Sequence, residues 1–223
     1  MLVTYKNQLE QLISLNKELK IVGICGGTGS GKTYLTNKLI HTFNDFNIQC
    51  IEVDSYYKDL SNLKFEDRAK NNFDHPSSFE FDVLVNDLNN LKKNKNASIP
   101  VYDYKTHTRT NKSKTINNNN DLIILEGIYS LYLKEVRDLL DLCIYIDVKS
   151  NIRKERRINR DMENRDRTYN SILNQYSKYV KPMHDQFIQP TRKHANIIIK
   201  KINKSDANYS KLLIRLTDLL KGT

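Results

Sequence analysis

Glycines are rare in this chain, yet most of them stand together in one short segment. Five of the seven lie between Gly23 and Gly31, and the run Gly26-Gly-Thr-Gly-Ser-Gly-Lys-Thr33 fits the pattern G-x-x-x-x-G-K-[ST]. Glycines permit the backbone angles and the close approach with which successive N–H groups surround a phosphate. The pattern predicts that Lys32 reaches the β- and γ-phosphates of a nucleotide and that the Thr33 hydroxyl is a ligand of Mg²⁺. The residues of this predicted phosphate-binding loop are Gly26, Gly27, Thr28, Gly29, Ser30, Gly31, Lys32 and Thr33.

The segments on either side of the loop support this interpretation. An apolar run at 20–25 precedes it and is typical of a buried strand. Leu35 and Leu39 follow it at helical spacing. A glycine-rich turn without a ligand is the alternative, but the strand–loop–helix order is the context that a phosphate-binding loop requires, and the helix N-terminus adds partial positive charge.

Two carboxylates stand at the ends of other apolar runs. Glu126 closes the run 121–126, and Asp54 closes the run 47–54. Ligands of parallel α/β sheets bind at the carboxyl ends of the strands. Such a residue can also be an ordinary loop residue, but two of them beside a phosphate-binding loop indicate a metal and catalytic site, with Glu126 as the metal-side carboxylate.

Arginines cluster in one later segment. Six of the eleven lie between Arg153 and Arg167, and Arg153, Arg157 and Arg160 share one stripe of a predicted helix. This stripe could be a solvated helix face, or it could form a lid in which guanidinium groups pair with phosphate oxygens.

Apolar, strand-like runs alternate with helical segments along the chain. This alternation predicts an α/β fold, with a P-loop NTPase-type parallel sheet flanked by helices. We expect an amphipathic helix at 1–19, one kinase-type domain at 20–203 and a packing C-terminal helix at 204–223. Within the domain, the segment 55–120 interrupts the alternation of strands and helices, and we expect it to be an insertion whose β-hairpin binds the acceptor substrate. The arginine lid covers about 151–175. The expected strands lie at about 20–25, 48–53, 122–126, 142–147 and 196–200, and those of the hairpin at 99–104 and 112–116.

Composition narrows the function further. The chain has 223 residues, 39% hydrophobic and 28% charged, which fits one globular domain. No apolar run approaches the ~18 residues of a membrane span, and no secretory signal is visible, so we expect a cytoplasmic protein without a membrane partner. Three cysteines without metal-ligand spacing indicate neither a disulfide framework nor zinc. The net charge of +10 leaves nucleic-acid binding as an alternative.

Several motifs occur together in an order that resembles the uridine kinase (uridine–cytidine kinase) family. The resemblance covers about residues 20–200. Its motifs are Asp54-Ser-Tyr-Tyr-Lys-Asp59, Asn72-Phe-Asp-His-Pro76, Pro100-Val-Tyr-Asp-Tyr-Lys-Thr-His-Thr-Arg109, Ile123-Ile-Leu-Glu-Gly127, Arg160-Asp161, Gln175-Tyr176, Val180-Lys-Pro-Met183 and Gln189-Pro-Thr-Arg-Lys193.

The resemblance implies a role for particular residues. Asp54 would be the general base on the nucleoside 5′-hydroxyl and would lie near Mg²⁺, whose site Thr33 and Glu126 complete. The implied contacts with the nucleoside come from Tyr57, Asp74 and Arg157 at the ribose and from Phe73, Tyr102, His107 and Gln175 at the pyrimidine. The implied phosphate lid consists of Arg160, Arg165 and Arg167. Asp166 stands where the family has a glycine.

The activity that the resemblance implies is transfer of the γ-phosphoryl group of ATP or GTP to uridine or cytidine, giving UMP or CMP in pyrimidine salvage. Its cofactors would be the nucleotide and Mg²⁺, and the family suggests a homotetramer without a stable nucleic-acid partner. A kinase of another hydroxyl acceptor on the same scaffold and a nucleotide-gated nucleic-acid-binding protein are the alternatives.

Overall fold

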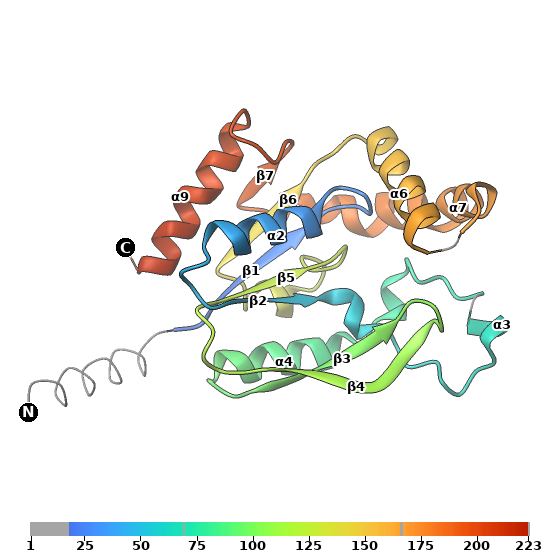
Figure 1. The fold of residues 1–223 in the computed structure, drawn as a ribbon, viewed down its shortest axis with the longest axis horizontal. Coiled ribbons are helices and arrows are strands. Elements are labelled where there is room, and N and C mark those ends of the chain that lie inside the picture. Colours follow the sequence, from blue (N-terminus) through green and yellow to red (C-terminus); the bar gives the residue numbers. More distant parts are fainter. Residues whose placement is uncertain (1–17, 69, 166, 223) are drawn as a thin grey trace, which may run out of the picture.

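A five-stranded parallel sheet forms the centre of the chain in a computed structural model, which describes residues 18–68, 70–165 and 167–222 (Figure 1). Its order is β2 (Ile48–Glu52), β5 (Leu122–Glu126), β1 (Lys20–Cys25), β6 (Leu142–Ile146) and β7 (Ile197–Ile199). Every neighbouring pair is parallel. The predicted parallel sheet flanked by helices is confirmed.

Helices cover both faces of this sheet, so its central strands are buried on both sides (Figure 1). On one face, α2 (Lys32–Thr42) and α9 (Ala207–Lys221) pack buried leucines against β1, β5 and β6. On the other face, α4 (Phe81–Lys92) packs against β1, β2 and β5. Burial on both sides explains why the strands read as continuous apolar runs rather than as alternating ones.

The helix α4 lies inside the segment 55–120, where the sequence interpretation placed only a hairpin. Leu84, Leu88 and Leu91 are fully buried and recur at i, i+4 and i+7, which is the spacing of one helix face. The helix therefore had a signal in the sequence. It supports the hairpin from the core side, because Ala97 and Ile99 belong to the same buried cluster.

The hairpin consists of β3 (Ala97–Asp103) and β4 (Thr108–Ile116), which are antiparallel. The second strand begins four residues before the predicted Lys112, since Thr108 and Arg109 already pair with Asp103 and Tyr102. Most of β4 is exposed and polar, so backbone pairing forms this strand without an apolar pattern. The connecting turn ends at His107, whose φ of 55° lies in the left-handed region.

The last third of the chain is mainly helical. The helix α6 (Ser150–Asn164) is followed by α7 (Tyr169–Gln175), the π-helical η3 (Tyr176–Val180), α8 (Lys181–Met183), the π-helical η4 (His184–Ile188) and the 3₁₀ segment η5 (Gln189–His194). Figure 1 shows α6 and α7 beyond the end of the sheet to which β1 points. The short elements elsewhere are η1 (Val53–Tyr56), α3 (Phe65–Arg68), η2 (Pro76–Ser78) and α5 (Lys134–Arg137).

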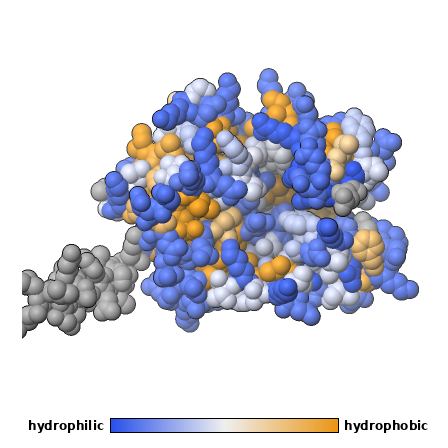
Figure 2. Space-filling model, in the orientation of Figure 1, coloured by the Kyte–Doolittle hydropathy of each residue, from blue (hydrophilic) through white to orange (hydrophobic). Residues whose placement is uncertain are grey.

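Two sequence expectations fall on residues that the structure does not describe. The amphipathic helix expected at 1–19 lies outside the described residues except for its last two positions, and Asp166 lies outside them as well. Within the described ranges, no helix is long and apolar enough to cross a membrane. The face seen in Figure 2 is largely hydrophilic, with its hydrophobic side chains in separate patches.

Candidate active site

The predicted phosphate-binding loop connects β1 to α2, as expected from the sequence. Gly31 is the N-cap of α2 and has a φ of 97°. Gly29 has a φ of 74°, and a Cβ there would collide with the backbone carbonyl of Arg153 in α6. Glycine is required at this position for both reasons. The loop thus opens α2, so the unpaired N–H groups of the first helical turn face the site.

Lys32 and Thr33 are the first two residues of α2 and point toward different partners. The Lys32 ammonium donates to the carbonyl of Gly26 at 3.2 Å, across the loop. The Thr33 hydroxyl donates to Oε1 of Glu126 at 2.8 Å. This bond joins the first turn of α2, which follows β1, to the carboxyl end of the neighbouring strand β5, 93 positions further along the chain.

Glu126 is nearly inaccessible to solvent, with 5% of its surface exposed. Burial raises the pKa of its carboxyl group, while Lys32 and the Thr33 hydroxyl oppose that shift. Its second oxygen, Oε2, is buried and has no hydrogen-bond partner in the structure. A buried carboxylate oxygen without a partner costs free energy unless a ligand satisfies it.

The residues around Glu126 fit a magnesium ion. Mg²⁺ prefers oxygen ligands and usually takes one or two carboxylates, while water and substrate phosphates complete its shell. Thr33, Glu126 and the nearby Asp54 supply such oxygens. Among the described residues, no cluster of three or more His, Cys, Asp and Glu side chains could hold a metal. The oxygens of Thr33, Glu126 and Asp54 suit a metal whose shell is completed by phosphate and water.

Asp54 lies in the 3₁₀ turn η1, because β2 ends at Glu52, one residue before the end of the strand expected at 48–53. The turn keeps Asp54 at the carboxyl edge of the sheet and leaves its side chain half-buried. Oδ2 accepts a hydrogen bond from the Tyr104 hydroxyl at 3.0 Å. Tyr104 follows β3 directly, so the hairpin reaches the candidate base through this residue.

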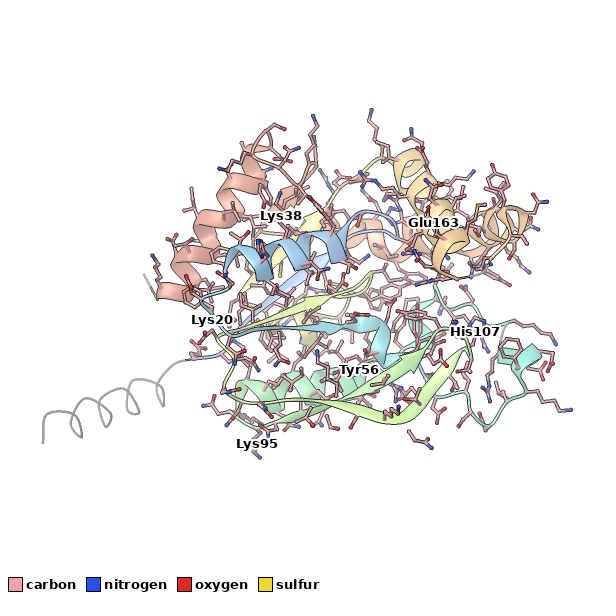
Figure 3. The ribbon with its side chains drawn as sticks, viewed as in Figure 1. Lys20, Lys38, Tyr56, Lys95, His107 and Glu163 are labelled. Atoms are coloured by element: carbon pink, nitrogen blue, oxygen red, sulfur yellow. The ribbon has the colours of Figure 1, made fainter. Side chains whose placement is uncertain are left out.

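Four predicted nucleoside-binding residues form one aromatic cluster, which we call the aromatic box. Its members are Tyr57, Phe73, Tyr102 and His107. The ring of His107 is stacked on that of Phe73, with centroids 5.4 Å apart and planes inclined by 19°. The Tyr57 ring lies 4.9 Å from Tyr102 and 5.6 Å from Phe73. Figure 3 labels His107 at the end of the hairpin. Phe65, 5.7 Å from His107, adds a further wall that the sequence interpretation missed.

Asp74 is buried directly beside the aromatic box, where it was expected to bind the ribose with Arg157. Its backbone carbonyl accepts a hydrogen bond from the Tyr129 hydroxyl, which fixes this stretch of chain to the core. Burial raises the pKa of its carboxyl group, and the positive charge of Arg157 is the largest opposing effect. The structure thus brings the two predicted ribose residues within electrostatic reach of each other.

The arginine stripe of α6 is not a solvated face. Arg153 and Arg157 are 5% and 6% exposed, and only Arg160 is open to solvent. Arg157 donates to the hydroxyl of Thr28 in the phosphate-binding loop at 3.1 Å and to Oε1 of Gln175 at 2.9 Å. The helix therefore presents guanidinium groups to the loop, which favours the lid interpretation over the solvated one.

Gln175, for which the resemblance implies a contact with the nucleoside, lies between two arginines of the site. Its Oε1 accepts hydrogen bonds from both Arg157 and Arg167. Burial lowers the pKa of Arg167, and the neighbouring charge of Arg157 acts in the same direction. The amide thus bridges two guanidinium groups that would otherwise repel each other.

The other lid arginines meet two residues that the sequence interpretation did not single out. Arg160 donates to Oδ1 of Asp161 at 2.9 Å. The Arg165 guanidinium lies over the ring of Tyr104 at 4.5 Å from its centroid. Asp161 follows directly after Arg160 in the motif, and Tyr104 is two residues beyond Tyr102. Alternation along an extended chain could have placed Tyr104 on the same side as Tyr102.

A cavity of about 790 Å³ opens beside Ser30 and Gly31 of the phosphate-binding loop. Its size suits a nucleotide base and sugar. The cavity is lined by Ser30, Gly31, Tyr34, Asp147, Val148, Lys149, Ile152, Arg156, Lys200, Lys201, Ile202 and Asn203. None of these residues except the two in the loop was singled out from the sequence.

Comparison with known proteins agrees with this geometry. Residues 21–208 match the Phosphoribulokinase / Uridine kinase family. A uridine kinase of Clostridium novyi is 49% identical over 179 residues, which are 80% of this chain and 86% of that protein. A uridine kinase of Macrococcus caseolyticus is 46% identical over the same shares of the two chains.

Solved structures share the fold at much lower sequence identity. The structure of a possible uridine kinase from Bacillus stearothermophilus is 18% identical and aligns with a TM-score of 0.60, covering 90% of this chain and 100% of that one. Phosphoribulokinase from Rhodobacter spheroides is 14% identical with a TM-score of 0.61, covering 87% and 75% of the two chains. With the loop, the strand-end carboxylates and the family match in agreement, the chain belongs to the phosphoribulokinase / uridine kinase family.

Proposed function

We propose that this chain is a uridine–cytidine kinase, which transfers the γ-phosphoryl group of ATP or GTP to the 5′-hydroxyl of uridine or cytidine. The products are UMP or CMP and the nucleoside diphosphate, a reaction of pyrimidine salvage. The aromatic box is the observation that carries this proposal, because it lies beside Asp54 and so offers a flat apolar pocket next to a proton acceptor. Curated relatives at 46% and 49% identity that are named uridine kinase support the same substrate.

On the donor side, the phosphates would lie in the loop between β1 and α2. The backbone N–H groups of the loop and the Lys32 ammonium hold negative charge, and Arg160, Arg165 and Arg167 add guanidinium groups from the lid. The base and sugar of the donor would occupy the cavity beside Ser30. Positioning and charge stabilisation supply most of the rate enhancement in this class of reaction.

On the acceptor side, the pyrimidine would stack in the aromatic box, with Tyr102 and His107 at its polar edge. Asp74 accepts from a ribose hydroxyl and Arg157 donates to one. Asp54 then accepts the proton of the 5′-hydroxyl as that oxygen attacks the γ-phosphorus atom, a role typically worth about 10²–10⁴-fold in rate.

Magnesium fits the oxygens of Thr33, Glu126 and Asp54 and, when bound with the nucleotide, would neutralise charge on the β- and γ-phosphates. Because Glu126 is bonded to Thr33, the chain holds this part of the site ready before any ligand arrives.

An ADP-release assay over a panel of nucleosides tests the acceptor. We expect turnover of uridine and cytidine and little of thymidine or purine nucleosides. Because buried partners of the 2′-hydroxyl would be left unpaired, we expect 2′-deoxyuridine to be used at least about 10²-fold less efficiently by kcat/KM. Preferred turnover of another hydroxyl acceptor would contradict the proposal.

Lys32→Ala tests the donor side. The side chain faces the loop rather than the core, so the variant should fold normally and lose phosphoryl transfer by at least about 10²-fold in kcat. Lys95→Ala is the matched control, since this exposed lysine lies far from the site near the start of the hairpin (Figure 3). Retention of more than about a tenth of the wild-type kcat in Lys32→Ala would rule out this role.

We also propose a homotetramer in the cytoplasm, on the basis of the family resemblance and the use of ATP. Light scattering on the purified chain measures the assembly directly, and a monomer at micromolar concentration would contradict it.

A further inference from the structure

Asp161 lies in α6 and has none of its surface exposed. It contacts all four arginines to which the proposed function gives a role, those at positions 157, 160, 165 and 167. The Nη2 atom of Arg160 lies 2.8 Å from Oδ1, and the Nε atom of Arg165 lies 3.7 Å from the same oxygen. The Nε atom of Arg157 lies 3.4 Å from Oδ2. The backbone N–H of Arg167 donates to the carbonyl oxygen of Asp161 at 3.3 Å.

The two carboxylate oxygens of Asp161 serve different sides of the site. Oδ1 meets Arg160 and Arg165, which belong to the proposed phosphate lid. Oδ2 meets Arg157, which also bonds to Thr28 in the loop and lies close to Asp74. One side chain thus stands between the groups proposed for the donor phosphates and the group proposed for the ribose.

Electrostatics explains why a carboxylate is needed here. Guanidinium groups stay charged at all ordinary pH values, and four of them in one small region repel one another. A buried carboxylate is costly unless it is paired, but this one has several cationic partners. A single negative charge among four positive ones reduces their repulsion and still leaves the lid positive overall, as phosphate binding requires.

We propose that Asp161 is a positioning residue that holds the lid arginines and Arg157 in one arrangement and so couples the donor side of the site to the acceptor side. This inference rests on the proposed function, in which Arg157 contacts the ribose and the lid contacts the phosphates. Both Oδ2 of Asp161 and Nε of Arg157 lack a hydrogen bond in the structure. Their separation of 3.4 Å leaves room for the pair to tighten when a nucleoside enters.

Asp161→Asn tests the inference because it keeps the shape and removes the charge. Its amide would also turn an N–H₂ group toward a guanidinium. We expect kcat/KM for uridine to fall by about 10²-fold, since buried charge pairs lose most when one partner is removed. We also expect the preference for uridine over 2′-deoxyuridine to fall at least tenfold, because Arg157 loses its orientation. Asp185→Asn is the matched control, since Asp185 forms an exposed ion pair with Lys181 on a helical turn.

The substrate preference separates positioning from a general loss of folded enzyme. A ratio of two kcat/KM values measured on one preparation does not depend on the fraction that is active, so a merely structural defect would leave it unchanged. Asp161→Glu, which restores the charge, should recover part of the ratio. Adding Asp161→Asn to Arg157→Met should change the ratio little further, because both act through the same group.

Failure of this inference differs from failure of the proposed function. A wild-type enzyme that does not phosphorylate uridine would overturn the proposed function. If the wild type does use uridine, an unchanged preference in Asp161→Asn together with unchanged affinity for a fluorescent ATP analogue would overturn the role of Asp161 alone. Weakened binding of that analogue in Asp161→Asn, but not in Asp185→Asn, would support the donor-side half of the coupling.

Discussion

Three acidic side chains of the site differ in their surroundings, and the difference separates their roles. Glu126 and Asp74 are buried, and burial raises the pKa of both carboxyl groups. Asp54 is half-buried in a turn and accepts a hydrogen bond from Tyr104. A carboxylate has two oxygens with about four acceptor positions, so the bond with Tyr104 fixes the orientation of Asp54 and leaves it able to accept a proton from a hydroxyl.

Asp54→Asn keeps the shape of the side chain and removes the proton acceptor. We expect kcat to fall by about 10²–10⁴-fold while KM for uridine changes less than about threefold, because the lost interaction belongs to the transition state. Steady-state kinetics with uridine varied at saturating ATP measures both values. Asp45→Asn, at an exposed position after α2, is the control. A normal kcat with a raised KM would assign Asp54 to substrate binding instead.

Residues that act within a local motif were the ones that sequence reasoning could find. The loop residues and Thr33 follow one another in a fixed pattern, and Glu126 ends a strand whose apolar run is plain in the sequence. Asp161 and Tyr104 also lie within motifs of the resemblance, but no role was assigned to either, because the motifs do not show which side chains meet. Tyr104 bonds to Asp54, 50 positions away, and Asp161 meets arginines on both sides of it in the chain. Only the folded arrangement brings these partners together.

At the scale of elements, α6 contacts the phosphate-binding loop through Arg157, and the hairpin contacts Asp54 through Tyr104. The hairpin contributes Tyr102, Tyr104 and His107, and α6 contributes Arg153 and Arg157. They meet where Arg165 lies over the Tyr104 ring. Figure 3 shows His107 and Glu163, a residue near the end of α6, at the same end of the molecule. Elements that were predicted separately therefore build one site.

His107→Ala tests the separation between the acceptor side and the donor side. The imidazole is stacked on Phe73, and burial and the charge of Arg167 lower its pKa, so it is neutral near pH 7. Loss of the stack and of one polar contact, at about 1–3 kcal/mol, should raise KM for uridine by about five- to 150-fold. KM for ATP should stay within about twofold, because the ring does not touch the loop.

Lys112→Ala is a control within the same hairpin, since that side chain is exposed on β4. Equal changes in both KM values for His107→Ala would show that the whole hairpin had moved. An effect on ATP alone would remove His107 from the pyrimidine side.

The elements that sequence analysis placed correctly are those with strong apolar signals. The central strands β1, β5 and β6 are buried on both faces and appear as continuous apolar runs. The length of β4 was underestimated because its pairing is made by the backbone, and its side chains are mostly exposed. The π-helical turns of η3 and η4 depend on packing and have no sequence pattern of their own.

At the scale of the whole molecule, a segment from the last quarter of the chain packs against the loop that follows the first strand. The π-helical segment η4 places His184 against Gly27 in the phosphate-binding loop, where the Arg153 guanidinium also lies. Nδ1 of His184 and Nη1 of Arg153 are buried without a hydrogen-bond partner. Two basic groups thus support the outer side of the loop, and only one of them can be charged without strong repulsion.

This arrangement predicts how stability depends on pH. Burial, and next the charge of Arg153, lower the pKa of His184 to about 4, well below the 6.5 of an ordinary histidine; Lys181 acts in the same direction, and Asp185 and Asp147 oppose it. The unfolded chain therefore binds more protons than the folded one between these two values, so the free energy of unfolding falls as the pH drops from about 6.5 toward about 4. Each unit of pKa difference corresponds to about 1.4 kcal/mol, which sets a maximum loss of about 3 kcal/mol from this one group.

Urea unfolding at pH 7 and pH 5 measures the effect, and His184→Gln should lose less stability between the two values than the wild type. His41→Gln, at an exposed position on α2, should follow the wild type. The difference between the two pH values within one protein removes any constant destabilisation caused by the substitution. Comparing these differences between the variant and the wild type removes the titration of the buried carboxylates, which the proteins share. Parallel losses in the wild type and in His184→Gln would show that His184 is not held neutral beside the loop.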